Sequence, residues 1–519
     1  MTAKAKKTAL PKDKFAAKRR AMVREFMRRM FLLGGFIGGT DTYKRTMWSA
    51  VPDIAIAHAA YSLTMRKGLS EPGAGDQLVM AGHEAMLNQW FNRPLLRKDI
   101  ILARDWAAEG SSVKAFPTEL WDEVMKGQVG DKISLPIDVW GFPGGQTFLK
   151  GVPCLTFEGM GGLISYLEPA MCRYFAPVIQ ATKARIMKAA TPRDAEFGLR
   201  AAVNELANVV LLLARYVGGR GQLTSNDTAE FLFPKLFKAI GTIGHEMMCS
   251  NQSLPESFPK AGIGIEAALE IVEQSLGEAE YEMMDRFVTK MGSASLLCDL
   301  VDATTIGFEN AIKVIKGHPE LSRVGVRVDS GDIVSQVIQY YDGMVAQGIT
   351  PRTIVFEDEV TPVAVAEVYA AFKKHTGVEP DCLFPGAGGY WWKLVHRDEV
   401  SAAFKRTATE NRPNTKFSNS PGKESLSGYL RVVGKGDTLI VCDVSEEQSL
   451  GGTPLFVKLV DQGRIVYKES FESQADRTDA TWGKYTKVEL SPKVKAWQDG
   501  FRAKRTAEIA SAKQRLAAA

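Results

Sequence analysis

Four strand-like runs in the second half of the chain end in acidic or glycine residues at nearly constant intervals. The runs "SASLLCDLVD", "VGVRVDSGD", "TIVFEDE" and "DCLFPGAGG" reach Asp299, Asp329, Asp358 and Gly386, and the successive spacings are 30, 29 and 28 residues. A strand-plus-helix unit that repeats at this length predicts parallel strands with right-handed crossovers. The carboxyl ends of such strands lie on one face, where barrel enzymes place their chemistry.

Helical spacing of apolar residues fills the intervals between these runs. The segments 333–345 and 365–372 both repeat apolar residues every three or four positions. The second segment follows Thr361 and Pro362, which suit an N-cap and the first position of a helix. We therefore predict an α/β fold for this part of the chain.

The remaining sequence predicts a second domain that both chain ends build. We expect helices over 43–64 and 75–91, strands within 131–142 and 151–159, and further short strands after residue 400. The predicted organisation is a basic N-terminal extension (1–37), an α/β sandwich-like domain (38–180 with 400–497), a (β/α) barrel domain (181–399) and a C-terminal helix or tail (498–519).

Composition excludes several other classes of protein. The net charge of +5 is small for 519 residues, and eleven Lys or Arg lie between Met1 and Met30, so the rest is balanced and no nucleic-acid partner is expected. The run "MFLLGGFIGG" lacks a persuasive cleavage site, and no run approaches the length of a membrane span. The six cysteines form no CxxC pair and predict reduced, buried thiols in the cytoplasm.

Three further features predict a site for a phosphorylated sugar and a flat anionic ring. Acids at strand ends bind ribose hydroxyls or Mg²⁺, while the glycine-rich turn after Gly386 and the cation Arg397 suit a phosphate. His245 stands in the open, glycine-flanked segment "GTIGHE" at a predicted strand-to-helix junction, whereas His58 and His83 are expected on helices. Phe197 and Arg200 are an aromatic ring and a cation three residues apart, at helical spacing, which suits a slot for a flat anionic ring. The alternative is that the two residues belong to an ordinary amphipathic helix.

Taken together, these features resemble a known family. The residues that carry the resemblance are "TDTYKRTM" (40–47), "PCLTFEG" to "YLEP" (153–169), "EFGLR" (196–200), "LTSND" (223–227), "GTIGHE" (241–246), "GVRVDSGD" (325–332) and "KFSNSPGKESLSG" (416–428). Their order and spacing resemble the nicotinate and nicotinamide phosphoribosyltransferases. The resemblance implies the irregular (β/α) barrel of type II phosphoribosyltransferases with an α/β sandwich-like domain, assembled as a homodimer.

The resemblance also implies roles for single residues. Tyr43 of the partner subunit would stack on the pyridine ring opposite Phe197, and His245 would be phosphorylated by ATP, with Mg²⁺ as a further cofactor. No metal ligand is assigned. The expected catalytic residues are His245 and Asp329, and the expected substrate-binding residues are Tyr43, Phe197, Arg200, Ser225, Arg327, Asp332, Asp358, Gly386, Gly388, Gly389 and Arg397.

The identity of the ring rests on one charge argument. Nicotinamide-type members carry an Asp where Ser225 stands, and a carboxylate there would repel nicotinate, so its absence favours the acid. The spacing from the glycines to Arg397, together with the nearby Asp227, keeps nicotinamide as the alternative. This chain also departs from the family's common Gly-Asp by carrying Glu357 and Asp358.

Other barrels and a non-enzymatic role remain open at this point. Quinolinate phosphoribosyltransferase should need more clustered cations, and an aldolase should present a lysine at a strand end. A binding module that uses the basic start is the non-enzymatic alternative. Neither class of enzyme fits the acidic and glycyl strand ends, and the presence of all five residues Tyr43, Phe197, Arg200, His245 and Asp329 argues against a fold without catalysis.

Overall fold

The computed structural model describes residues 19–23, 25, 35–92, 95–250, 265–417 and 424–518. Most of the predicted basic extension and the middle of the "KFSNSPGKESLSG" motif lie outside these residues. The chain divides into two compact units. Unit 1 comprises Met1–Arg185, Val209–Arg220 and Leu394–Ala519, and unit 2 comprises Ile186–Asn208 and Gly221–Lys393. The finer domain boundaries given above stay predictions.

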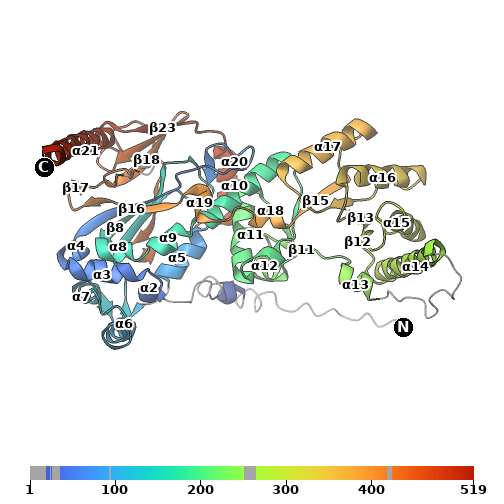
Figure 1. The fold of residues 1–519 in the computed structure, drawn as a ribbon, viewed down its shortest axis with the longest axis horizontal. Helices are drawn as coiled ribbons and strands as arrows, with labels where there is room; N and C mark the ends of the chain where they lie inside the picture. The colour runs from blue at the N-terminus through green and yellow to red at the C-terminus, as the bar shows by residue number, and fades with distance from the viewer. Residues whose placement is uncertain are drawn as a thin grey trace, which may run out of the picture. The chain divides into compact units, whose positions relative to one another are not determined.

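Unit 2, several of whose strands are labelled in Figure 1, is built on a sheet. The sheet has seven strands, and every pair of neighbours is parallel. The strand order is β11-β10-β9-β15-β14-β13-β12. The strands are β9 (Ala195–Glu196), β10 (Leu223–Thr224), β11 (Lys238–Ala239), β12 (Ala294–Leu297), β13 (Val324–Val328), β14 (Ile354–Phe356) and β15 (Leu383–Ala387). The predicted α/β pattern and the four strand-like runs are confirmed.

Helices cross between consecutive strands of this sheet. They are α15 (Ile306–Gly317), α16 (Ile333–Ala346) and α17 (Pro362–Thr376). The predicted start of α17 is confirmed, because the Thr361 side chain accepts a hydrogen bond from the Ala364 amide and Pro362 is the first helical residue. Val365, Val368 and Phe372 form the buried face of α17. Apolar spacing therefore fixed which face of the helix packs on the sheet.

A side chain links the two terminal strands of the sheet, where backbone pairing between strands stops. Thr242, three residues after β11, donates its hydroxyl to the Ser295 carbonyl of β12 at 3.0 Å. The Ser295 amide donates back to the Thr242 hydroxyl at 2.8 Å. Two hydrogen bonds of a single threonine therefore join the two terminal strands of this sheet.

Unit 1 contains an antiparallel sheet to which both halves of the chain contribute strands. Its order is β17-β16-β1-β8-β6-β21-β22. The strands are β1 (His58–Thr64), β6 (Ile137–Gly141), β8 (Pro153–Met160), β16 (Ala403–Thr409), β17 (Arg412–Pro413), β21 (Val457–Asp461) and β22 (Arg464–Ile465). A four-stranded sheet, β20-β18-β19-β23, is formed by Thr453–Pro454, Leu430–Lys435, Thr438–Asp443 and Lys487–Leu490. The last helix is α21 (Pro492–Ala518).

Two of the predicted helices are wrong in part. Within 43–64 the structure has α3 (Thr42–Ala50) and α4 (Pro52–Ile56), followed by strand β1, so His58 lies on a strand. Within 75–91 it has β2 (Gln77–Val79) and α5 (His83–Phe91). Strand β1 is buried on both faces, so its apolar residues do not alternate with polar ones. Such a run cannot be told from a buried helix by its period.

All six cysteines are free. Cys154, Cys298 and Cys442 are buried, whereas Cys249 is exposed, so burial was predicted correctly for only part of the set. Burial raises the pKa of the Cys154 and Cys298 thiols to about 12, which keeps them protonated. No helix among the described residues combines the length and the hydropathy needed to cross a bilayer.

Gly325 provides a test of how closely β13 and β14 pack. A Cβ at Gly325 would lie 2.1 Å from the Thr353 carbonyl oxygen. We expect Gly325→Ala to lower the free energy of unfolding by about 3 kcal/mol, because the backbone atom it meets cannot move aside. Scanning calorimetry should show a lower Tm for this variant. Gly317→Ala is the control, since nothing lies within 4 Å of its added Cβ, and an equal loss in both variants would contradict the packing argument.

Candidate active site

Chemically active side chains gather where the parallel strands of unit 2 end. Asp299 lies two residues after β12, while Asp329 and Glu357 come directly after β13 and β14. Glu196 is the last residue of β9, and Gly386 lies in β15. Because the strands are parallel, these side chains share one edge of the sheet, where barrel enzymes bind their substrates.

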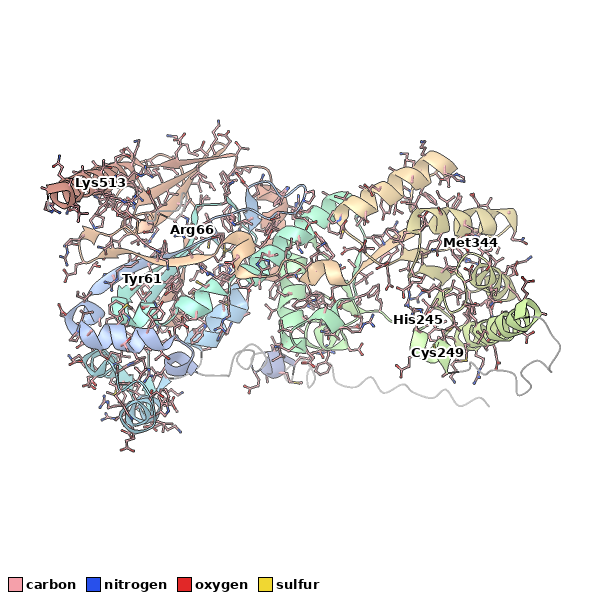
Figure 2. All side chains as sticks on the ribbon, viewed as in Figure 1. Tyr61, Arg66, His245, Cys249, Met344 and Lys513 are labelled. Atoms are coloured by element: carbon pink, nitrogen blue, oxygen red, sulfur yellow. The ribbon has the colours of Figure 1, made fainter. Side chains whose placement is uncertain are left out.

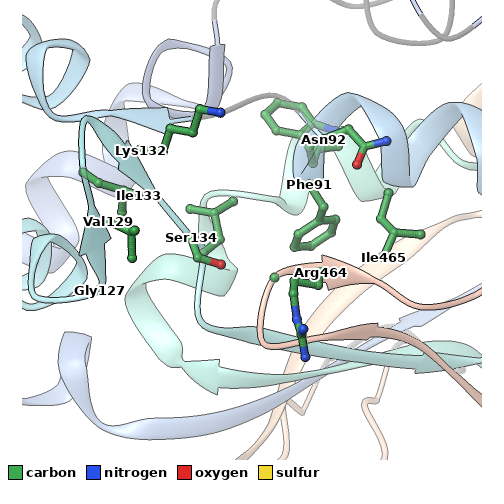
Figure 3. Close-up of a pocket in the computed structure, with 12 residues that line it drawn as sticks. Phe91, Asn92, Gly127, Val129, Lys132, Ile133, Ser134, Arg464 and Ile465 are labelled. Carbon is green, nitrogen blue, oxygen red and sulfur yellow. The ribbon is translucent and has the colours of Figure 1, made fainter.

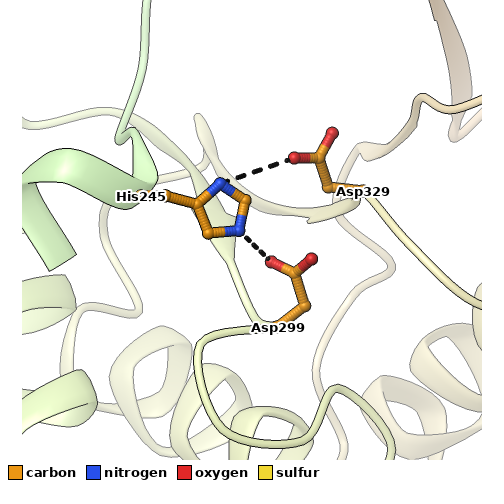
Figure 4. Close-up of side chains that lie close together, drawn as sticks. All are labelled: His245, Asp299 and Asp329. Carbon is orange, nitrogen blue, oxygen red and sulfur yellow. Dashed lines mark hydrogen bonds and ion pairs between the residues drawn. The ribbon is translucent and has the colours of Figure 1, made fainter. Parts of the chain in front are cut away.

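His245 is held between two of these carboxylates (Figure 4). It is the first residue of α13 (His245–Cys249), six residues after β11, which confirms the predicted strand-to-helix junction (Figure 2). Its Nε2 lies 2.9 Å from Asp299 Oδ1, and its Nδ1 lies 3.8 Å from Asp329 Oδ2. Ser330 donates its hydroxyl to the other Asp299 oxygen at 2.7 Å. Asp299 is therefore fixed on both sides and orients the imidazole ring through Nε2.

His245, Asp299 and Asp329 also have the residue types of a metal site. His245, Asp299 and Asp329 each offer one ligand atom, and these atoms lie within 4.8 Å of one another. Mg²⁺ prefers oxygen ligands in an octahedron and binds imidazole poorly. Both oxygens of Asp299 already accept hydrogen bonds, from His245 and from Ser330. The trio therefore fits a hydrogen-bonded His–Asp pair better than a magnesium cage.

Arg327 projects from the end of β13 into the same cluster. Its NH1 donates to the Ile243 carbonyl at 3.1 Å, and its NH2 lies 3.5 Å from Asp329 Oδ2. Its Nε lies 3.6 Å from Glu357 Oε1, and this buried nitrogen has no hydrogen-bond partner. A buried N–H without a hydrogen-bond acceptor is costly, and the ion pair with Glu357 offsets part of that cost.

Glu357 has an unusual environment for a glutamate. Burial raises the pKa of its carboxyl to about 7; Asp329 adds to the increase, while Arg327 and Arg200 oppose it. The next two residues, Asp358 and Glu359, have φ values of 59° and 42°. Non-glycine residues rarely adopt this left-handed conformation, and it concentrates at functional sites. The end of β14 thus combines a strained backbone at Asp358 and Glu359 with a carboxyl group of raised pKa at Glu357.

Phe197 and Arg200 are brought to the site by a loop rather than by a helix. Phe197 follows β9, and Arg200 lies in the 3₁₀ turn Leu199–Ala201, so the predicted helical spacing is wrong. A Cβ at Gly386 would lie 2.4 Å from the Phe197 ring, which means that the ring needs a glycine at this place in β15. Gly198 is similarly confined, since its added Cβ would lie 2.7 Å from the Gly388 carbonyl oxygen.

Glu196 organises this loop and was missed as a site residue. It is 2% exposed, and its Oε1 accepts hydrogen bonds from the Gly198 amide at 2.7 Å and from Asn208 at 3.2 Å. Its Oε2 accepts from the Thr224 hydroxyl at 2.9 Å. No pattern in the sequence marked Glu196, because its strand has only two residues and follows a polar segment. A buried carboxylate with three donors fixes the start of the loop.

The structure describes four further predicted residues. Asp332 caps α16, because its carboxylate accepts from the Ser335 hydroxyl and amide, and these bonds lower its pKa. Ser225 is exposed, directly after β10, and its amide donates to the Glu196 carbonyl at 3.0 Å. Gly388 precedes the short helix α18 (Gly389–Trp392), and nothing lies within 4 Å of a Cβ added at Gly389. Their predicted contacts with substrate stay predictions.

Tyr43 and Arg397 belong to unit 1, and the structure describes their contacts there. Tyr43 is half-exposed and donates to Glu168 Oε2 at 3.1 Å. Glu168 also binds Lys44 and Lys405. Burial acts to raise the pKa of this carboxyl, but the hydrogen bonds from the two lysines outweigh it and lower the pKa. Arg397 donates through Nε to the Ala402 carbonyl at 3.0 Å.

Unit 1 also contains an open pocket of about 440 Å³ (Figure 3). Phe91, Lys132 and Arg464 are among its lining residues. No residue of the cluster at the strand ends of unit 2 lines it. No carboxylate or histidine is among the described residues that line this pocket, so the chemistry of this chain is better placed at the strand ends.

Comparisons with known proteins identify the fold. No protein-family model matches the chain, and no curated protein matches its sequence. Among solved structures, a human nicotinic acid phosphoribosyltransferase is similar with a TM-score of 0.61 and 18% identity, over 89% of this chain and 99% of the other. A nicotinate-nucleotide pyrophosphorylase from Pyrococcus furiosus is similar with a TM-score of 0.54 and 15% identity, over 93% and 99%.

The chain therefore has the mixed α/β fold of type II phosphoribosyltransferases, with a parallel half-barrel sheet. At the level of the fold, the resemblance to the nicotinate and nicotinamide phosphoribosyltransferases is confirmed.

The role of Glu196 can be tested without any substrate. We expect Glu196→Ala to lower the free energy of unfolding by about 3 kcal/mol, because three donors lose their buried acceptor. Hydrogen exchange should become faster in a peptide that covers 195–201, since the Gly198 amide loses its partner. Glu196→Gln keeps one oxygen and should have a smaller effect. Unchanged exchange in this peptide for Glu196→Ala would contradict the positioning role.

Proposed function

We propose that this protein transfers the phosphoribosyl group of phosphoribosyl pyrophosphate to nicotinate, giving nicotinate mononucleotide and pyrophosphate in NAD salvage. The observation that carries the proposal is the cluster of His245, Asp299, Arg327 and Asp329 at the strand ends of a sheet with the phosphoribosyltransferase fold. The human structure with this fold is described as a nicotinic acid phosphoribosyltransferase. The alternative product is nicotinamide mononucleotide, from nicotinamide.

The cluster suits the chemistry of ribosyl transfer. The pyridine nitrogen forms a bond to C1 of the ribose, the bond from C1 to the pyrophosphate oxygen breaks, and positive charge develops on the ribosyl centre between these events. Asp329 stabilises that charge at the strand ends. The reaction needs positioning more than a strong base, and Phe197 provides the flat face on which the ring is positioned.

The preference for the acid rests on residues around the ring. Arg200 is exposed at the 3₁₀ turn, so its guanidinium group is open to a carboxylate, while Arg327 is a second cation that Glu357 and Asp329 share. Ser225 brings no negative charge to the end of β10. The position of Glu357 favours the alternative substrate, nicotinamide. An ionised carboxylate beside Arg327 suits an amide better than an acid.

ATP coupling through His245 is part of the proposal. Asp299 accepts a hydrogen bond from Nε2–H, which leaves the Nδ1 lone pair free, since Asp329 is 3.8 Å away and beyond hydrogen-bond distance. Nδ1 would attack the γ-phosphorus of ATP, and ADP would leave. We also propose that Mg²⁺ enters with pyrophosphate oxygens as ligands, that the protein is a homodimer and that it works in the cytoplasm. No ligand from the chain is assigned to Mg²⁺.

One assay tests the proposed function. The full chain is incubated with phosphoribosyl pyrophosphate, Mg²⁺ and either nicotinate or nicotinamide, with and without ATP, and the mononucleotide is identified by mass spectrometry. We expect nicotinate mononucleotide, formed faster with ATP. Exclusive formation of nicotinamide mononucleotide would favour the alternative, and the absence of both products would reject the proposal.

Arg200 should contribute to binding of the ring and not of the sugar. We expect Arg200→Ala to raise the KM for nicotinate about 10- to 100-fold, the usual cost of a lost hydrogen bond to a charged group. The KM for phosphoribosyl pyrophosphate should change little. Arg286→Ala is the control, because Arg286 is exposed and pairs with Glu282 on its own helix. An equal increase in both Michaelis constants for Arg200→Ala would contradict a slot for the ring.

His245 should couple ATP to the transfer. We expect His245→Ala to abolish stimulation by ATP while slow transfer continues, because the site for the ring and the sugar remains. The measurement is the initial rate of mononucleotide formation with and without ATP. His318→Ala is the matched control, since His318 forms a similar pair with Asp285 at 2.9 Å outside the cluster. Stimulation that persists in His245→Ala would reject the phosphohistidine.

A further inference from the structure

Glu357 is fixed at the centre of the cluster by the end of β14. Its amide donates to the Val328 carbonyl of β13 at 2.9 Å, so the residue continues the pairing of the two strands. Its side chain is 20% exposed. The carboxyl group therefore stays close to the strand ends instead of turning into solvent.

Glu357 and Phe197 border the same glycine. A Cβ built at Gly386 would lie 2.4 Å from the Phe197 ring and 3.1 Å from the Glu357 Cγ. A flat ring that stacks on Phe197 therefore has Glu357 close to its edge. Asp358 and Glu359 keep their left-handed backbone directly after this residue, which indicates that the placement of Glu357 is maintained against a local cost.

The charges around Glu357 are balanced before a substrate arrives. Arg327 is 3.6 Å away on β13, and Arg200 acts on Glu357 from the 3₁₀ turn. Asp329 follows β13 and pairs with the same Arg327 at 3.5 Å, and His245 lies on the far side of Asp329 at 3.8 Å. A third carboxylate from a substrate would leave three acids to share two guanidinium groups.

From this arrangement we infer that Glu357 determines which acceptor binds: its carboxylate competes with the carboxylate of an acidic ring for Arg327, so nicotinate binds only when Glu357 is protonated. An amide ring carries no charge and binds in either state. The inference rests on the proposed function and deepens it, because it makes the acceptor preference of this chain depend on a proton.

Glu357 is the acid in the cluster that is prepared to take up this proton. Burial, together with Asp329, raises its pKa to about 7. Its folded-state pKa is raised, so the protonated form dominates below pH 7 and disappears as the pH rises through that value. The apparent affinity for nicotinate should fall with the protonated fraction.

The test compares the two acceptors across this range of pH. We measure kcat/KM for nicotinate and for nicotinamide at pH 6.0 and pH 8.5, with saturating phosphoribosyl pyrophosphate and Mg²⁺. The ratio of the two values cancels every effect of pH that the two acceptors share. We expect the nicotinate-to-nicotinamide ratio to fall about 30-fold over this interval, which is the loss of the protonated fraction for a pKa of about 7.

Glu357→Gln gives the decisive comparison because it is neutral at every pH. Its acceptor ratio should be independent of pH and should favour nicotinate at pH 8.5 relative to the unmodified protein. Glu359→Gln is the matched control, an exposed glutamate two residues further along, and it should keep the full dependence on pH. A flat ratio in the unmodified protein, or an unchanged slope in Glu357→Gln, would overturn the inference.

A binding measurement separates this inference from the proposed function. Isothermal titration of nicotinate at pH 7.5, in two buffers with different ionisation enthalpies, reports the protons taken up on binding. We expect proton uptake in the unmodified protein and none in Glu357→Gln. If both pyridines are converted but no proton is taken up, the inference fails while the proposed function stands. If neither pyridine binds or is converted, both fail.

Discussion

Parallel pairing of short strands is the constraint on which the site of this protein depends. Strands β12 to β15 pair in register, so Asp299, Asp329 and Glu357 emerge at one edge although about thirty residues separate each from the next. The close approach of β13 to β14 at Gly325 leaves no room for a side chain. Without this spacing the acids would not meet the guanidinium group of Arg327.

The edge is completed by side chains that link segments rather than by further strands. Thr242 joins the end of β11 to β12, and this brings the segment before His245 alongside the acids. Glu196 does the same for the loop after β9, which carries Phe197. Thr242 is partly buried and Glu196 is fully buried, and the hydrogen bonds of both fix a single arrangement because every partner lost is costly.

Much of the fold could be predicted from the sequence where the pattern was periodic. The strand before Asp329, the strand that contains Gly386 and the helix after Thr361 follow from apolar spacing and capping, which are local properties. Strand β1 could not be predicted, because burial on both faces removes the alternation that marks a strand. The site followed the same division: Asp329 and His245 stand at recognisable junctions, whereas Glu196 looks like any acid in a short polar run.

The sequence by itself determined the order of strands and helices in unit 2 and the acids and glycines at their ends. It also determined the resemblance of these motifs to the nicotinate and nicotinamide phosphoribosyltransferases. Only the tertiary structure decided that Glu357 would face Arg327 and lie beside Gly386, and that His245 would pair with Asp299 instead of any other acid. The physical reason is that spacing along a chain fixes which face a residue occupies, while distance and burial across strands depend on how those strands pack. The same packing buries Glu357 and so raises the pKa of its carboxyl, and the sequence of a single strand could not predict this increase.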